Sequence, residues 1–272
     1  MTSKPDTDAV FVGSVPEIYD KYLVPLIFES YADDLAARLP SLTRGRVLEL
    51  AAGTGVVTRA LARSLPVSVE VVGSDLNQDM LDRAAAIGTS REVSWRLADA
   101  LELPFDDGSF DAVLCQFGVM FFPDKVRAYG EAHRVLRRGG PFIFNTWDCI
   151  EENEFADVVT GAVGTLFPDD PPRFLARTPH GYFDEEEIRH HLALGGFDAV
   201  EIEPLEARSR AALAGDPAIA YCHGTPLRDE IEARDPSRLG EAAEVATAAI
   251  ERRFGATEVD GRIRGYVVTA KR

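Results

Sequence analysis

The chain has 272 residues, 46% of them hydrophobic, and its 45 acidic residues outnumber its 29 basic residues, giving a formal net charge of −16. An acidic surface repels polyphosphate backbones, so we expect no nucleic-acid partner. No apolar run reaches the length of a membrane span, residues 1–8 are polar, and the three cysteines lack the spacing of a disulfide framework or a metal site. We therefore expect a cytoplasmic protein with no signal peptide, no membrane span and no metal.

The first half of the chain alternates between helical and strand-like segments. Residues 1–8 resemble a disordered leader, and apolar residues recur at helical spacing over residues 17–39, where Pro25 interrupts the helix. Short apolar runs and helical periodicity then predict strands over 47–50, 69–74, 93–97, 110–116 and 141–145, and helices over 58–65, 77–87 and 125–136. This succession predicts an α/β fold with a doubly wound, mostly parallel sheet.

The second half is less regular. Residues 148–180 contain four prolines and predict a helix followed by an irregular connection. The pattern that follows predicts helices over 184–194, 216–234 and 238–254 and strands over 197–206 and 262–270. Asp184 is the expected N-cap of its helix, and Gly195 and Gly196 are the expected stop. Two helices between the last two strands exceed a simple connection, so we interpret them as a cap over the sheet edge.

The stretch from Arg46 to Thr58 is the most informative part of the sequence. An apolar strand ends on Glu49, a turn of small residues follows, and a helix begins directly after it. Small residues allow a ligand to approach the backbone closely, and the helix N-terminus offers unpaired N–H groups. A carboxylate at this strand end favours a ligand with a cationic amine.

Polar residues also end the next three predicted strands. Asp75 ends the second strand, where it can accept hydrogen bonds from ribose hydroxyls, Asp99 and Ala100 follow the third, and Gln116 ends the fourth. Each acid taken singly is also explained as a helix N-cap. Their order beside the glycine turn favours one ligand site along the sheet edge.

These segments resemble class I S-adenosylmethionine-dependent methyltransferases. The resemblance rests on Val47–Gly55, Gly73–Leu81, Ala98–Phe105, Phe110–Val113 and Arg134–Gly140, and it covers about residues 15–146. Within that family the chain is similar to the small-molecule branch that includes ubiquinone/menaquinone-biosynthesis-type enzymes. The resemblance implies S-adenosyl-L-methionine as cofactor, S-adenosyl-L-homocysteine as product and no metal.

The resemblance also implies a role for each residue of the row. Glu49 would face the methionine ammonium, and the backbone of Ala51–Gly55 with Thr54 would hold the methionine portion. The implied cofactor-binding set is Tyr22, Glu49, Ala51, Gly53, Thr54, Gly55, Asp75, Leu76, Asp99, Ala100, Gln116 and Phe117. Asp75 would bind the ribose hydroxyls, Leu76 and Ala100 would contact adenine, and Asp99 would accept from its amino group. Gln116 and Phe117 would close the pocket near the sulfonium, and Tyr22 would lie over the methionine end.

Ala51 departs from the family pattern, because many members have glycine there. Alanine is still small, so we expect tighter packing and retained binding.

The family layout implies a seven-stranded Rossmann-like sheet with an antiparallel final strand and a helical cap. We expect one domain over residues 1–272. Its parts would be an N-terminal helical lid at 15–40, a cofactor-binding core at 41–146 and a substrate-side half at 147–272 that includes the cap at 212–256.

The expected reaction is in-line displacement of the methyl group onto a small, apolar or aromatic acceptor. Because a sulfonium is already activated, alignment is the main task and a general base is optional. His180 and His223 are the candidates for such a base, although a structural role explains each equally simply. Cys115-Gln116-Phe117-Gly118 is not the signature of nucleic-acid amino-methylating enzymes. The acceptor atom and the oligomeric state stay open.

Two alternatives remain at this point. An NAD-type dehydrogenase shares the glycine turn and the acid, but the turn lacks the third small residue of that fingerprint, and Glu49 would face pyrophosphate. A non-catalytic module that binds S-adenosylmethionine would use the same turn and strand-end residues but would transfer no methyl group.

Overall fold

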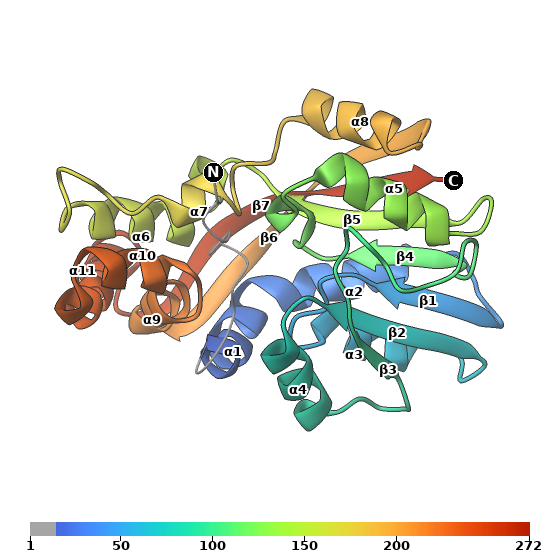
Figure 1. The fold of residues 1–272 in the computed structure, drawn as a ribbon. Coiled ribbons are helices and arrows are strands. Elements are labelled where there is room, and N and C mark those ends of the chain that lie inside the picture. Colours follow the sequence, from blue (N-terminus) through green and yellow to red (C-terminus); the bar gives the residue numbers. More distant parts are fainter. Residues whose placement is uncertain (1–14) are drawn as a thin grey trace. The chain divides into compact units, whose positions relative to one another are not determined.

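The computed structural model describes residues 15–272 (Figure 1). The expectations for residues 1–8 lie outside this range. The strands form a seven-stranded sheet in the order β3-β2-β1-β4-β5-β7-β6. Their bounds are β1 Gly45–Glu49, β2 Val69–Asp75, β3 Ser94–Leu97, β4 Ala112–Cys115, β5 Pro141–Trp147, β6 Ala199–Leu213 and β7 Thr257–Lys271.

The predicted sheet is confirmed. The pairs β1–β2, β1–β4, β2–β3 and β4–β5 are parallel, and β7 runs antiparallel to β5. Strand β1 lies between β2 and β4. The chain adds β2 and β3 on one side of β1 and then β4 and β5 on the other side, so the strand order reverses between β1 and β4. In doubly wound sheets, ligands bind outside the carboxyl ends of the strands at this switch point. Glu49 is the last residue of β1 and pairs with Gly73 of β2 and Leu114 of β4.

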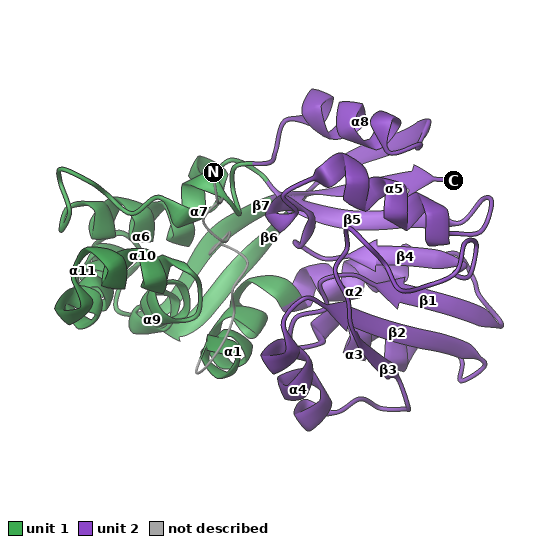
Figure 2. Ribbon diagram, viewed as in Figure 1, with its two compact units in different colours: residues 1–28, 148–181, 206–264 green, residues 29–147, 182–205, 265–272 purple. Residues whose placement is uncertain are grey.

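The chain divides into two compact units (Figure 2). Among the described residues, unit 1 comprises 15–28, Asp148–Gly181 and Glu206–Arg264, and unit 2 comprises Glu29–Trp147, Tyr182–Leu205 and Gly265–Arg272. The predicted lid at 15–40 is therefore shared between the two units. The proposed single-domain organisation stays a prediction.

Unit 2 contains the parallel strands and the helices that cover them. Its helices are α2 Glu29–Ala37, α3 Val56–Ser64, α4 Gln78–Ile87, a 3-10 turn Val119–Phe121, α5 Lys125–Val135 and α8 Glu185–Leu194. Asp184 caps α8 by accepting from the backbone N–H groups of Glu186 and Glu187, and Gly196 beyond its end has φ +98°, as predicted for the stop.

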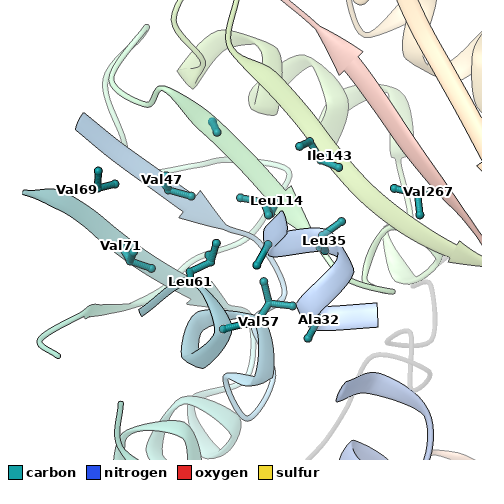
Figure 3. Close-up of a cluster of buried hydrophobic side chains, with 13 residues drawn as sticks. Ala32, Leu35, Val47, Val57, Leu61, Val69, Val71, Leu114, Ile143 and Val267 are labelled. Carbon is teal, nitrogen blue, oxygen red and sulfur yellow. The ribbon is translucent and has the colours of Figure 1, made fainter. Parts of the chain in front are cut away.

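A hydrophobic cluster fills the space between one sheet face and the helices α2 and α3 (Figure 3). The cluster combines Leu35 from α2, Leu61 from α3 and Leu114 from β4. Alternate residues of a strand point to opposite faces, so Ile143 of β5 joins this cluster while its neighbours Phe142 and Phe144 pack on Tyr129 of α5. Helices therefore bury both faces of the sheet, which is why its strands read as continuous apolar runs.

Unit 1 is mostly helical. Its elements are α1 Val15–Ile18, a π-helix Tyr19–Phe28, a 3-10 turn Ile150–Glu152, α6 Glu154–Gly164, α7 Phe174–Arg177, α9 Gly215–His223, α10 Leu227–Arg234, a 3-10 turn Pro236–Arg238 and α11 Leu239–Phe254. Helix α11 packs against α6 and α9, and α9 packs against the π-helix. The cap helices predicted between the last two strands are thus present as α9, α10 and α11; their place over the sheet edge stays a prediction.

Two predicted helices differ from the structure. The single helix over 216–234 is wrong, because the chain breaks at Gly224–Pro226. There the Thr225 hydroxyl donates to the carbonyl of Tyr221 (2.6 Å) and accepts from the N–H of Leu227 (3.2 Å), which ends one helix and begins the next.

The predicted helix over 17–39 is instead three segments, the middle one a π-helix that contains Pro25. Proline lacks an N–H and crowds the preceding turn, so regular α-helical bonding is lost at this point.

The last two strands are longer than predicted. Strand β6 continues to Leu213, beyond the predicted end at residue 206, and β7 extends past the predicted range 262–270 at both ends. Charged residues of β6 are partly exposed along most of its length, so its sequence lacks the apolar run on which the prediction relied.

We expect Leu61→Ala to lower the free energy of unfolding of unit 2 by about 2–5 kcal/mol, because the truncation leaves a cavity in the cluster. Both tryptophans, Trp95 and Trp147, lie in unit 2, so urea denaturation followed by tryptophan fluorescence measures the change. The matched control is Leu194→Ala on α8, an exposed side chain whose loss should change the unfolding free energy by less than about 0.5 kcal/mol. Equal losses from the two variants would contradict this description of the core.

Candidate active site

Glu49 is a buried carboxyl group at the carboxyl end of β1. Its side chain is 1% exposed, and its Oε2 accepts a hydrogen bond from the hydroxyl of Thr58 on α3. Burial raises the pKa of Glu49 to about 8; the Thr58 hydrogen bond and the Arg59 charge lower it, and the charge of Asp75 raises it further. The pKa therefore lies where an approaching cation would draw the carboxyl group into its charged form.

The turn after Glu49 has an unusual backbone. Ala51, Gly53 and Gly55 have φ values of +50°, +56° and +84°, in the left-handed region that glycine adopts readily and alanine does not. The N–H of Ala52 donates to the carbonyl of Ser74 (2.8 Å), which ties the turn to the neighbouring strand. Thr54 lies buried within the turn. The small residues thus form a tight connection from β1 into α3.

Asp75 ends β2 directly beside this turn. Its Oδ2 accepts from the N–H of Gly53 (2.8 Å), and its Oδ1 accepts from the N–H of Asn77 (2.8 Å) and from the Asn77 side-chain amide (3.3 Å). Burial raises the pKa of Asp75, while these hydrogen bonds oppose the rise. Glu49 and Asp75 are therefore brought together as two buried acids, and Leu76 beside them is 56% exposed.

The residues predicted at the end of the third strand, Asp99 and Ala100, directly follow a residue that is hydrogen-bonded to Asp75. The N–H of Ala98 donates to the carbonyl of Asp75 (3.0 Å). Asp99 is exposed, and its Oδ1 accepts from the N–H of Leu101 (2.9 Å) in a local turn, which Ala100 completes. Asp99 thus has a structural partner already, but in a turn and not as the N-cap of a helix.

Gln116 and Phe117 follow β4 and are both buried. Phe117 has φ +48°, and its ring stacks on Trp147 with centroids 3.6 Å apart and planes inclined by 3°. A Cβ placed on Gly118 would lie 2.5 Å from the Cβ of Ala51, so the loops that follow β1 and β4 are in close contact. Glycine at position 118 makes this approach feasible.

Tyr22, His180 and His223 lie in unit 1, whereas the other candidates lie in unit 2. His180 is buried, and its Nδ1 lies 2.9 Å from the carbonyl oxygen of Asp148. Burial lowers the pKa of His180 to about 4, although this hydrogen bond and the charge of Asp148 raise it. His223 is the last residue of α9, and burial lowers its pKa too. Both imidazoles therefore favour the neutral form.

Sequence reasoning missed Thr58 and Trp95. Trp95 of β3 packs so closely that a Cβ on Gly55 would lie 2.7 Å from its Cη2, and a Cβ on Gly73 would lie 2.6 Å from its Cζ3. Trp95 therefore supports the glycine turn from the next strand but one. The available signal was Gly73, since a glycine inside a strand marks a close approach.

Residues 15–272 contain no group of three or more His, Cys, Asp or Glu side chains arranged to hold a metal ion. In the same range, no helix has both the length and the apolar character that a bilayer span requires.

Comparison with known proteins agrees with the site geometry. Residues 48–144, which run from Leu48 through β1, β2, β3 and β4 into β5, match the family model described as a methyltransferase domain. This region holds a class I S-adenosylmethionine-dependent methyltransferase domain. The family resemblance found in the sequence is thereby confirmed.

Relatives of the methyltransferase domain carry related names. A ubiquinone/menaquinone biosynthesis C-methyltransferase UbiE of a Geobacter species is 39% identical over 103 residues, which are 36% of this chain and 44% of that protein. A demethylmenaquinone methyltransferase of Thermus thermophilus is 45% identical over 100 residues, 36% of this chain and 45% of that protein. The chain thus spans less than half the length of these relatives.

A solved structure extends the likeness beyond the methyltransferase domain. A putative methyltransferase from an antibiotic biosynthesis pathway of Anabaena variabilis has a TM-score of 0.62 and covers 90% of this chain and 98% of its own. At 17% sequence identity, this likeness concerns the fold.

We expect the stability of the unliganded protein to depend on pH through Glu49. Its folded-state pKa of about 8 exceeds the ordinary value of 4.5. The contribution of Glu49 is therefore fully present below about pH 4.5 and is lost as the pH rises to about 8, because the folded state holds the proton more tightly. Each pKa unit corresponds to about 1.4 kcal/mol, so the loss is on the order of a few kcal/mol.

Glu49→Gln should flatten this part of the profile, measured as unfolding free energies in urea between pH 5 and pH 9. Glu92→Gln, at an exposed position before β3, removes the same charge and should follow the unaltered protein. Parallel profiles for the Glu49→Gln variant and the unaltered protein would show that Glu49 titrates normally.

Proposed function

We propose that the chain transfers a methyl group from S-adenosyl-L-methionine to a small, apolar or aromatic acceptor by in-line displacement. The observation that carries this proposal is the pair of buried acids Glu49 and Asp75, placed side by side at the switch point of the sheet and joined by the glycine turn. No basic side chain donates a hydrogen bond to either carboxyl group among the hydrogen bonds of the described residues.

The chemistry of these two groups fits the cofactor. Burial disfavours the charged form of both carboxyl groups, and a ligand that brings an ammonium and a sulfonium offsets this cost. A pyrophosphate would add negative charge beside them, which argues against the dehydrogenase alternative. Asp75 is in addition a strong acceptor for a pair of neighbouring ribose hydroxyls.

We assign the candidate residues to parts of the cofactor. Glu49 binds the methionine ammonium, the turn Ala51–Gly55 with Thr54 holds the methionine portion, and Asp75 binds the ribose. Leu76, Asp99 and Ala100 contact adenine. Gln116 and the backbone at Phe117 complete the methionine end. The place of Tyr22, which belongs to unit 1, over the methionine stays a prediction from the sequence. The exposed fraction of Leu76, 56%, leaves its side chain available to pack on a flat ring.

The residues of the chain mainly align the cofactor with the acceptor, and they take little part in making the new bond to the methyl group. Bound S-adenosylmethionine supplies a methyl group activated by the sulfonium. Glu49 and Asp75 hold the methionine ammonium and the ribose, the groups on either side of the sulfonium. The rigid turn between the two acids limits the freedom of the cofactor, so that an acceptor approaches along one line. The low pKa of His180 makes it a weak base, and an acceptor that is itself acidic, such as a phenol, needs little assistance.

The relatives support the acceptor class. Their names refer to ubiquinone and menaquinone biosynthesis and to demethylmenaquinone, which are small aromatic or quinoid molecules. We extend to this chain only the class, a small molecule with an apolar or aromatic ring. The cytoplasm is the proposed location, in keeping with three cysteines that form no disulfide.

The deciding experiment is transfer of a labelled methyl group from S-adenosylmethionine to a panel of phenols, quinols, carboxylic acids and amines. We expect label in at least one ring-bearing acceptor and S-adenosylhomocysteine in equal amount. Glu49→Gln is the matched negative control, because it keeps the shape of the side chain and removes its charge. Binding of S-adenosylhomocysteine without transfer to any acceptor would identify a non-catalytic binding module instead.

We expect Asp75→Ala to weaken S-adenosylhomocysteine binding about 10- to 100-fold, since a hydrogen bond to a charged group contributes about 1.5–3 kcal/mol. Calorimetric titration measures the dissociation constant. Asp82→Ala, on the exposed face of α4, removes one negative charge and should leave binding unchanged. An unchanged affinity in the Asp75 variant would mean that the ribose binds elsewhere.

A further inference from the structure

Two non-glycine residues with left-handed backbone lie at the switch point of the sheet. Ala51 follows β1 with φ +50°, and Phe117 follows β4 with φ +48°. The contact between Ala51 and Gly118 joins the two loops. Strained conformations of this kind persist only where the surroundings enforce them, and they concentrate at functional sites.

Three aromatic rings provide the constraint, and we call Tyr31, Phe117 and Trp147 the aromatic clamp. Phe117 lies flat on Trp147, with ring centroids 3.6 Å apart, and Tyr31 meets both rings edge-on at 4.9 Å and 5.3 Å. Tyr31 is itself fixed, because its hydroxyl donates to the carbonyl of Leu205 (2.9 Å). The clamp thus joins α2, β5 and the loop after β4.

Gly265 of β7 completes the site of the Phe117 ring. A Cβ on Gly265 would lie 3.3 Å from Cε1 of Phe117 and 2.6 Å from the carbonyl oxygen of Thr146. The ring of Phe117 is 5% exposed. Other protein groups therefore cover the Phe117 ring, and the ring does not contact a ligand directly. It affects a ligand by fixing the backbone of residues 116–118.

We propose that the aromatic clamp is a positioning device for the methionine end of the cofactor, and this inference rests on the proposed function. By holding Phe117 in the left-handed conformation, the clamp presses Gly118 against Ala51 and fixes Gln116 at the end of β4. Phe117 and Trp147 act as positioning residues rather than as ligand contacts. The ribose and adenine parts of the site are on other strands, because Asp75 ends β2 and Asp99 follows β3, whereas Phe117 follows β4 and Trp147 ends β5.

The test compares two ligands that differ only at the methionine end. S-adenosylhomocysteine carries the amino-acid portion, whereas 5′-methylthioadenosine lacks it and keeps the adenosine. Trp147→Leu should raise the dissociation constant of S-adenosylhomocysteine about tenfold or more, because the stacked pair is lost, and that of methylthioadenosine by less than about threefold. Trp147→Phe keeps a flat ring and should restore both constants to within about threefold of the unaltered protein.

Phe117→Leu provides a second variant in case Trp147→Leu fails to fold, as judged by its thermal unfolding. It removes the stacking from the other side and should give the same selective loss. Equal weakening of both ligands in these variants, or no weakening of either, would overturn the positioning role. Failure of the unaltered protein to bind S-adenosylhomocysteine would overturn the proposed function itself. That outcome is separate, because it is read before any variant is made.

Discussion

The candidate site depends on two carboxyl groups buried side by side. Glu49 and Asp75 end adjacent strands, and removing them from water costs free energy that the protein offsets only in part, through the Thr58 hydroxyl and the N–H groups of Gly53 and Asn77. The raised pKa values of both groups express the remaining cost. In the proposed function, a ligand with positive charge offsets this remaining cost. The glycine turn, the neighbouring strand end and the contact with the β4 loop all serve to hold these acids in place.

The aromatic clamp draws on residues at or near the ends of the chain segments that make up unit 2. Trp147 is the last residue of one segment of unit 2 and Leu205 the last of another, Gly265 is the first of the next, and Tyr31 lies two residues after Glu29, where unit 2 begins. These residues either belong to the aromatic clamp or contact it within unit 2. The loop after β4, which we assign to the methionine end, is therefore held within unit 2 by residues from all three of its chain segments.

Much of the fold, and less of the site, could be predicted from the sequence. The alternation of buried strands and helices has strong periodicity, and the strand-end acids occupy positions that topology alone specifies, so both were accessible. The break at Gly224–Pro226 and the π-helix around Pro25 depend on local hydrogen bonds that compete with regular helix, and periodicity does not report them. Trp95 and Trp147 were missed because their roles arise from contacts between segments distant in sequence. Thr58 was missed because a hydroxyl group in the first turn of a helix carries no signal of its partner, the Glu49 carboxyl group on the preceding strand. The resemblance placed Phe117 near the sulfonium, whereas its ring is packed against Trp147 and Tyr31.

Ala51 shows how the two loops constrain each other. Where a family pattern has glycine, this chain has alanine in a left-handed conformation, at a cost on the order of 1–3 kcal/mol. Its methyl group occupies the space that a side chain at position 118 would need, so alanine at 51 requires glycine at 118. Glycine at 118, in turn, gives the β4 loop more freedom than other residues would, and the stacked ring of Phe117 removes that freedom again. Ala51, Gly118 and the aromatic clamp therefore depend on one another. Alanine makes the turn beside Glu49 stiffer than glycine would, and this requires the rings of the clamp to hold the loop after β4 in place.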